Sequence, residues 1–189
     1  MPASSPSSAT RGLIVMGVSG SGKTTIGERL AERLGWTFED GDSFHPPSNI
    51  EKMRSGHALT DADREPWLRA IADEIDRQVA SGRQLVIACS ALKRRYRDIL
   101  VHGRDDIHIV YLDGDEDLIA RRLAGRRGHF MPPDLLGSQF RTLEKPTTDE
   151  HAITVDINAP VERIVDAILD RLAAEGLIAP AAPRASGPR

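Results

Sequence analysis

Residues 17–25 have the sequence Gly17-Val18-Ser19-Gly20-Ser21-Gly22-Lys23-Thr24-Thr25, which fits the pattern G-x-x-x-x-G-K-[ST] of a phosphate-binding loop. The apolar run at 13–16 before this loop predicts a short buried strand. The segment 25–34 after it carries apolar residues at helical spacing. The motif therefore lies between a strand and a helix, which is the context that phosphate binding requires.

The residue types in this loop suit a triphosphate and its metal ion. Glycines lack Cβ atoms and tolerate positive φ, so the backbone at 17, 20 and 22 can wrap closely around phosphate oxygens. Successive N–H groups and the helix N-terminus then face the anion. Lys23 supplies positive charge for the β- and γ-phosphates, and the Thr24 hydroxyl is a ligand that Mg²⁺ accepts. The alternative is a chance glycine-rich turn, which the flanking strand and helix disfavour.

Composition bounds the class of protein. The chain of 189 residues has the length of one domain, and its formal net charge of -3 leaves no electrostatic footprint for nucleic acid or a membrane surface. Its apolar runs fall short of the roughly 20 residues of a membrane span. The single cysteine, Cys89, excludes an internal disulfide and fits a reducing compartment, so we expect a cytoplasmic protein. We interpret Cys89 as a small buried residue rather than a nucleophile.

Strands and helices are expected to alternate along the chain. Further strands are predicted at 36–40, 84–89, 107–112 and 153–156, each followed by a helical pattern or a loop. We expect Asp63 to cap one of the helices, with Pro66 in its first turn. The pattern predicts an α/β fold in three layers, with a five-stranded parallel sheet and helices on both faces. We expect a kinase-like domain at 12–175, between disordered tails at 1–11 and 176–189 that are rich in Pro and Ala.

Ligands of parallel α/β sheets gather at the carboxyl ends of the strands, so the loops there hold the candidate residues. Asp40 and Asp42 follow the second strand, whereas no aspartate ends the third strand. One of them would hold Mg²⁺ and the other would accept the proton of a substrate hydroxyl or a hydrogen bond from it. The alternative is that both are turn residues, because Asp-Gly is a favoured turn pair.

Two basic segments follow later strands. The first includes Arg121, Arg122 and Arg126, and we favour a mobile lid at about 122–137 over a solvated helix end. In the second, Lys93 and Arg97 are one helical turn apart and are expected to share a face. Two interpretations fit this second segment equally well. It is either a patch that binds an anionic small substrate or an ordinary solvated face.

The motifs together resemble the small P-loop gluconokinases, which are relatives of the shikimate and adenylate kinases. Beyond the generic phosphate loop, four specific motifs carry the resemblance: D-G-D-S-F-H-P-P-S-N-I-E-K-M from Asp40, L-T-D-A-D-R-E-P-W-L from Leu59, A-C-S-A-L-K-R-R-Y-R-D-I-L from Ala88, and H-F-M-P-P-D-L-L-G-S-Q-F-R-T-L-E from His129. They cover most of 12–146 in order. The departures, Ala58 in place of a proline and Val101 in place of a basic residue, are peripheral.

This resemblance implies phosphorylation of D-gluconate at its C6 hydroxyl by ATP, with Mg²⁺, and a homodimer. By motif position it places Arg122 and Ile157 at the nucleotide. Together with the residue chemistry above, it gives Lys23, Asp42 and Arg126 as catalytic residues and Thr24 and Asp40 as Mg²⁺ ligands, with the division between the two aspartates left open. Substrate binding falls to Asp42, His45, Lys52, Arg64, Lys93, Arg97, His129 and Gln139. Gluconate is an anion, so its carboxylate needs a cationic partner such as Arg64 or Lys52.

Two other functions compete with this one. Another small-molecule kinase, acting on shikimate or a nucleotide, would share the phosphate loop. A nucleotide-binding switch without transfer chemistry is disfavoured, because the chain lacks the N-K-x-D that guanine-specific switches use and carries paired aspartates and an arginine-rich segment.

Overall fold

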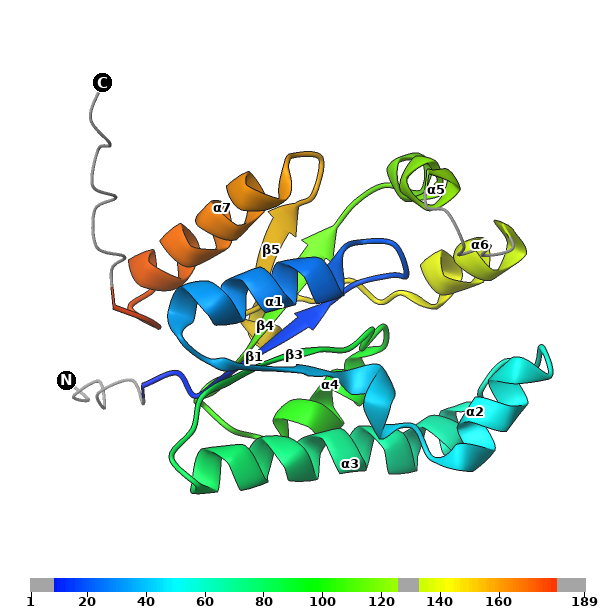
Figure 1. The fold of residues 1–189 in the computed structure, drawn as a ribbon, viewed down its shortest axis with the longest axis horizontal. Helices are drawn as coiled ribbons and strands as arrows, with labels where there is room; N and C mark the ends of the chain where they lie inside the picture. Colours follow the sequence, from blue (N-terminus) through cyan, green and yellow to red (C-terminus); the bar gives the residue numbers. More distant parts are fainter. Residues whose placement is uncertain (1–8, 126–132, 180–189) are drawn as a thin grey trace.

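The computed structural model describes residues 9–125 and 133–179 (Figure 1). Its centre is a sheet of five parallel strands in the order β2-β3-β1-β4-β5. The strands are β1 (Gly12–Met16), β2 (Thr37–Asp40), β3 (Leu85–Ala88), β4 (Ile107–Asp113) and β5 (Ile153–Asp156). The predicted five-stranded parallel sheet is therefore confirmed.

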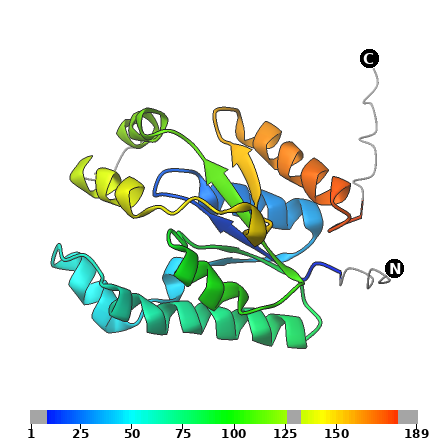
Figure 2. The same ribbon diagram turned by 180° about the vertical axis from the view of Figure 1, so that it is seen from behind.

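Helices cover both faces of the sheet. One face carries α1 (Lys23–Leu34) and α7 (Val161–Ala174), and the other carries α3 (Asp61–Ala80) and α4 (Arg94–Val101), as the two opposite views show (Figures 1 and 2). The side chains of β1 alternate between the two cores. Leu13 and Val15 pack with α1 and α7, whereas Ile14 and Met16 pack with α3 and α4. Because both faces are buried, the strand is apolar throughout.

Shorter elements stand at the carboxyl edge of the sheet. The 3-10 turn η1 (Gly41–Phe44) and α2 (Pro47–Arg54) follow β2, and α5 (Glu116–Ala124) follows β4. The chain continues through α6 (Pro133–Thr142) and the 3-10 turn η2 (Thr148–Glu150) before β5. Beyond this edge, α2 projects on the side of α3, and α5 and α6 project on the other side (Figure 1).

The start of α3 differs from the expectation. Thr60, not Asp63, is the N-cap, and its hydroxyl accepts a hydrogen bond from the Asp63 N–H at 3.2 Å. The Asp63 carboxylate accepts the Thr60 N–H at 2.6 Å in return, so the two residues form a capping box. Pro66 consequently lies inside the helix, beyond the first turn where we expected it.

The packed chain extends beyond 12–175 at both ends. Thr10 is buried, and the Arg11 N–H donates to the Asp106 carbonyl at 2.8 Å. At the other end, Leu177 and Ile178 pack against the core. Residues 1–8 and 180–189 lie outside the described residues.

The arginine-rich segment is helical where it is described. Arg121 and Arg122 belong to the last turn of α5, and the predicted lid at 122–137 also includes the start of α6. Arg126 and His129 lie outside the described residues. Among the helices that the structure describes, none has the length and apolar character that a membrane crossing requires.

Candidate active site

The phosphate-binding loop joins β1 to α1 in a conformation that requires glycine. Gly17, Gly20 and Gly22 have φ values of 153°, 83° and 96°, and Gly22 is the N-cap of α1. A Cβ on Gly17 would lie 2.7 Å from the Ser21 Oγ. The Lys23 ammonium folds back over the loop and donates to the Val18 carbonyl at 3.1 Å. The N–H groups of the first turn of α1 have no intrahelical acceptors, so they suit an anion.

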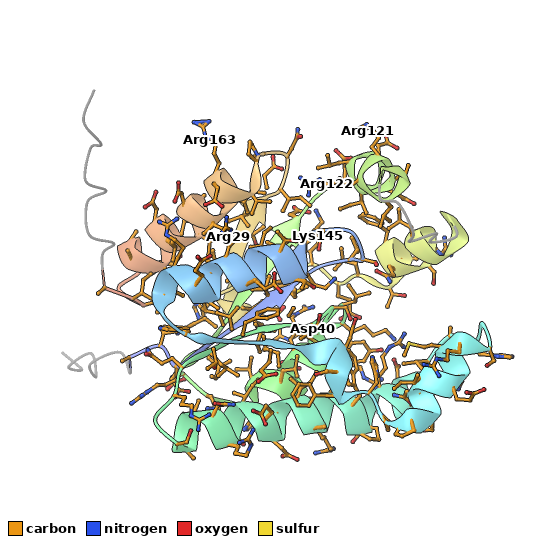
Figure 3. The ribbon with its side chains drawn as sticks, in the orientation of Figure 1. Arg29, Asp40, Arg121, Arg122, Lys145 and Arg163 are labelled. Atoms are coloured by element: carbon orange, nitrogen blue, oxygen red, sulfur yellow. The ribbon has the colours of Figure 1, made fainter. Side chains whose placement is uncertain are left out.

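Asp40 and Thr24, the two expected Mg²⁺ ligands, lie together. Asp40 ends β2, and its Oδ2 accepts a hydrogen bond from the Thr24 hydroxyl at 3.5 Å. Figure 3 shows Asp40 at the carboxyl edge of the sheet, beside the start of α1. A carboxylate and a hydroxyl are oxygen ligands of the kind that Mg²⁺ uses together with phosphate and water. The described residues contain no cluster of three His, Cys, Asp or Glu side chains that could hold a metal ion.

Asp42 is placed differently from Asp40. Its backbone N–H donates to the Asp40 Oδ1 at 3.0 Å, which fixes the turn, while its own side chain is 84% exposed. The Asp42 Oδ1 is 4.0 Å from the His45 Nε2. The structure therefore separates the two aspartates: the Asp40 carboxylate contacts the phosphate loop and the turn, and the Asp42 carboxylate extends from η1 beside His45.

His45 is held by Trp67 of α3. The two rings stack with centroids 4.1 Å apart and planes 16° apart. The Trp67 indole N–H donates to the Gly41 carbonyl at 2.7 Å, so the same residue fixes both η1 and the imidazole. Burial lowers the pKa of His45 against the opposing effect of the Asp42 carboxylate. The imidazole is accordingly neutral at pH 7 and acts as a hydrogen-bonding group rather than a cation.

Lys52 connects α2 to the start of α3. Its ammonium is 2.6 Å from the Asp63 Oδ2, and the buried Asn49 side chain donates to the Asp63 carbonyl at 2.8 Å. Hydrogen bonds from Lys52 and Thr60 hold the pKa of Asp63 well below its usual range. Lys52 is thus one member of an ion pair between α2 and the start of α3.

Arg64 and Lys93 meet around Tyr96. The Arg64 Nη1 donates to the Tyr96 hydroxyl at 3.4 Å, and its guanidinium carbon lies 5.8 Å from the ring centroid. The Lys93 ammonium lies 3.1 and 3.2 Å from the two Asp61 oxygens. The Tyr96 hydroxyl donates to Asp61, and this bond is the main cause of the lowered pKa of the carboxyl. Arg95 also pairs with Asp61, at 2.9 Å.

Arg97, which was expected at the substrate, lies in the core and is paired with Glu150. Its side chain is 2% exposed, and its guanidinium forms two bonds to Glu150, at 2.5 and 2.9 Å. A further nitrogen donates to the Ala91 and Leu92 carbonyls. Lys93 also precedes α4 in extended backbone, so the two cations do not share a helix face as we expected. Arg97 is part of the core, because a partner distant in sequence supplies the matching carboxylate.

Two residues that the resemblance assigns to the nucleotide are in contact. The Arg122 guanidinium donates to the Ile157 carbonyl in the loop after β5. Figure 3 shows Arg122 on the side of α5 toward that loop, whereas Arg121 points outward. The Ile157 N–H donates to the Asp113 carbonyl at 3.0 Å, which ties this loop to the end of β4. The two residues are therefore neighbours, and their role at the nucleotide stays a prediction.

Known proteins with similar sequences and structures are kinases. The family profile described as shikimate kinase matches residues 19–173. A gluconokinase from Gluconobacter oxydans is 49% identical over 162 residues, which cover 86% of this chain and 89% of that protein. A probable gluconokinase from Mus musculus is 45% identical over 177 residues, or 85% and 96% of the two chains. The chain belongs to the gluconokinases of the shikimate kinase family. A solved gluconokinase from Sinorhizobium meliloti superposes with a TM-score of 0.80 at 45% identity, covering 89% of this chain and 95% of that one.

Gln139 has a different neighbour from the one that the gluconokinase resemblance suggested. Its Oε1 accepts a hydrogen bond from the Ser19 N–H at 2.7 Å. Gln139 therefore contacts the phosphate-binding loop. In contrast, Lys52 bonds Asp63 at the start of α3, and Arg64 and Lys93 both lie beside Tyr96.

Several residues that organise this gluconokinase-family site were not singled out from the sequence. They are Asn49, Asp61, Trp67 and Tyr96, which contact His45, Arg64, Lys93 or Asp63, the partner of Lys52. All four lie inside the family motifs that carried the resemblance. Their signal was a polar or aromatic residue placed among the expected substrate residues.

Proposed function

We propose that this chain transfers the γ-phosphoryl group of ATP to the C6 hydroxyl of D-gluconate, giving 6-phospho-D-gluconate and ADP. The observation that carries the proposal is the 3.5 Å contact between the Thr24 hydroxyl and the Asp40 carboxylate. It joins the loop that suits a triphosphate to the turn that bears Asp42 and His45. The identity to gluconokinases over most of the chain supports gluconate as the acceptor.

On the ATP side, each group has an electrostatic task. Lys23 and Arg122 stabilise negative charge on the phosphates, and the N–H groups at the start of α1 bind phosphate oxygens. Thr24 and Asp40 would hold Mg²⁺, which neutralises phosphate charge when bound. Their oxygen atoms fit this ion, and the short distance between them lets one cation contact both.

On the sugar-acid side, Asp42 accepts the proton of the C6 hydroxyl, and neutral His45 hydrogen-bonds the polyol. Within the described part of the chain, Lys52 and Lys93 each pair with an aspartate, whereas Arg64 forms no ion pair and contacts the neutral Tyr96. Arg64 therefore retains an uncompensated positive charge. We assign it to the gluconate carboxylate, because a guanidinium and a carboxylate form two parallel hydrogen bonds.

A coupled assay of ADP release tests the reaction. The panel consists of D-gluconate, other sugar acids, shikimate, nucleoside monophosphates, and D-glucitol, which replaces the carboxylate of gluconate with a neutral group. We expect the highest kcat/KM for gluconate. Turnover of shikimate or of a nucleotide, without turnover of gluconate, would overturn the proposal.

The Arg64→Ala variant tests the carboxylate assignment. Loss of a charged hydrogen-bonding partner, worth about 1.5–3 kcal/mol, should raise the KM for gluconate roughly 10- to 150-fold and leave the KM for ATP unchanged. Arg69→Ala is the matched control, since Arg69 is an exposed arginine on the same helix, paired with Glu65. An equal loss of affinity for both substrates in Arg64→Ala would show that Arg64 is structural. The variant should also lose the preference for gluconate over D-glucitol.

A further inference from the structure

The amide of Ser19 is bonded to a side chain rather than left for an anion. Its N–H donates to the Gln139 Oε1 at 2.7 Å, across 120 positions of sequence. We infer that Gln139 is a positioning residue for the phosphate-binding loop, and thereby for phosphoryl transfer, and that it does not bind the sugar acid.

The same loop segment is held from three sides. The Val18 carbonyl accepts the Ser21 N–H at 3.2 Å and the Lys23 ammonium at 3.1 Å. Gly20 packs so closely on α5 that an added Cβ would lie 2.8 Å from the Leu123 Cγ. Gln139 fixes the peptide between these two points. The orientation of the following N–H groups, which face the phosphates, therefore depends on the contact with α6.

Helix α6 is itself anchored, so its glutamine is a fixed reference. Leu136 is buried in the core on the side of α1 and α7. Just beyond the helix, the Glu144 N–H donates to the Leu92 carbonyl at 2.8 Å. The Glu144 carboxylate accepts the Arg94 N–H, also at 2.8 Å. Leu92 and Arg94 lie between the end of β3 and the first residue of α4. Through α6, the phosphate loop is therefore connected to the segment that carries Lys93.

The amide side chain suits this task because it is neutral. A glutamine oxygen accepts a backbone N–H without placing negative charge beside a triphosphate. A glutamate of the same length would make the hydrogen bond equally well and would repel the phosphates. Glutamine and glutamate thus differ in charge, and leucine differs from both because it lacks an acceptor.

Three variants test this inference: Gln139→Leu, Gln139→Glu and Gln84→Leu. Gln84 provides the matched control, because its amide also bonds a backbone group, the Thr10 carbonyl at 2.9 Å, just before β3 at the opposite edge of the sheet. We expect Gln139→Leu to weaken binding of ADP and of a non-hydrolysable ATP analogue about three- to tenfold by titration calorimetry, from the net value of one hydrogen bond. Gln139→Glu should weaken it further, and Gln84→Leu should leave it unchanged.

Steady-state kinetics give the second readout. In Gln139→Leu the KM for ATP should rise and kcat should fall, while the KM for gluconate at saturating ATP stays within twofold of the wild-type value. A rise confined to the KM for gluconate would assign Gln139 to the sugar acid and overturn the inference. Unchanged or tighter nucleotide binding in Gln139→Leu would overturn it as well.

The kinetic readout depends on the proposed function, but the binding readout does not. If the wild-type protein binds nucleotide and does not turn over gluconate, the proposed function fails and the titrations still decide the role of Gln139. Should Gln139→Leu fail to fold, Gln139→Glu retains the acceptor and keeps the comparison of nucleotide affinity possible.

Discussion

Replacing Arg97 with methionine should destabilise the fold without affecting substrate affinity. Arg97 and Glu150 are 2% and 5% exposed, and two hydrogen bonds join them. Removing one member of such a buried pair leaves the other charge uncompensated, which costs about 3–5 kcal/mol. In a protein of this size, each kcal/mol lowers Tm by about 2–4 °C, so we expect a decrease of roughly 6–20 °C.

The charge of Glu150 adds a pH signature to this prediction. Burial alone would raise the pKa of Glu150, but the bonds from Arg97 and from the Thr147 N–H lower it. Without Arg97 the effect of burial dominates, so the folded-state pKa rises above the unfolded value. A group with a raised folded pKa contributes less stability as pH increases, so Arg97→Met should be most destabilised near pH 8 and partly recover near pH 5.

Urea unfolding followed by circular dichroism measures both effects, with Arg94→Met as the control. Arg94 is on the same helix and pairs with Asp149, the neighbour of Glu150, but this pair is exposed. Its loss should cost at most about 1 kcal/mol. Replacing Arg97 and Glu150 together with methionine should recover most of the stability. An Arg97→Met variant as stable as the wild type would refute this prediction. A tenfold rise in the KM for gluconate in such a stable variant would assign Arg97 to the substrate instead.

Three further outcomes follow from the site. Lys23→Ala should lower kcat by about 10²–10³ with an unchanged melting curve, because it removes charge stabilisation in the transition state; a near-normal kcat would contradict that role. Asp42→Asn should lower kcat in steady-state assays and leave both KM values little changed, whereas a rise confined to the KM for gluconate would indicate binding only. The pKa values of Asp61 and Asp63 are lowered in the folded state, so their stabilising effect is present above their unfolded pKa of about 3.9 and is lost as pH falls below it. The urea concentration at the unfolding midpoint should therefore decrease when the pH is lowered below about 4. A midpoint that does not change with pH down to about 2 would count against these contacts.

Much of the fold could be predicted because its signals are local. A strand buried on both faces is a continuous apolar run, and the phosphate-binding loop is a contiguous motif, so β1 and α1 could be identified from adjacent residues. The rule that ligands bind at the carboxyl ends of parallel strands predicts that Asp40 lies near Thr24, and the two side chains are in contact. The start of α3 was less certain, because Thr60 and Asp63 are both capping residues, and only their reciprocal bonds distinguish the cap from the third helical residue.

What the sequence could not supply were partners far apart along the chain. Arg97 and Glu150 are separated by 53 positions, and Ser19 and Gln139 by 120. Helical spacing places Arg97 among four neighbouring basic and aromatic residues. It contains no information on the Glu150 carboxylate, which lies in η2. The same limit explains why Gln139 was grouped with the sugar acid by its motif, although its contact is with the phosphate loop.

The four cations that were expected at the substrate differ in how their charges are paired. Lys52 and Lys93 lie beside aspartates at the edge of the sheet, and Arg97 is enclosed with Glu150. Each of these acids lowers the cost of holding a cation in place when no anion is bound. Arg64 instead rests against the ring and hydroxyl of Tyr96, which orient it without neutralising it. We therefore expect an anionic substrate to gain most from Arg64, because binding there does not require an internal ion pair to be broken first.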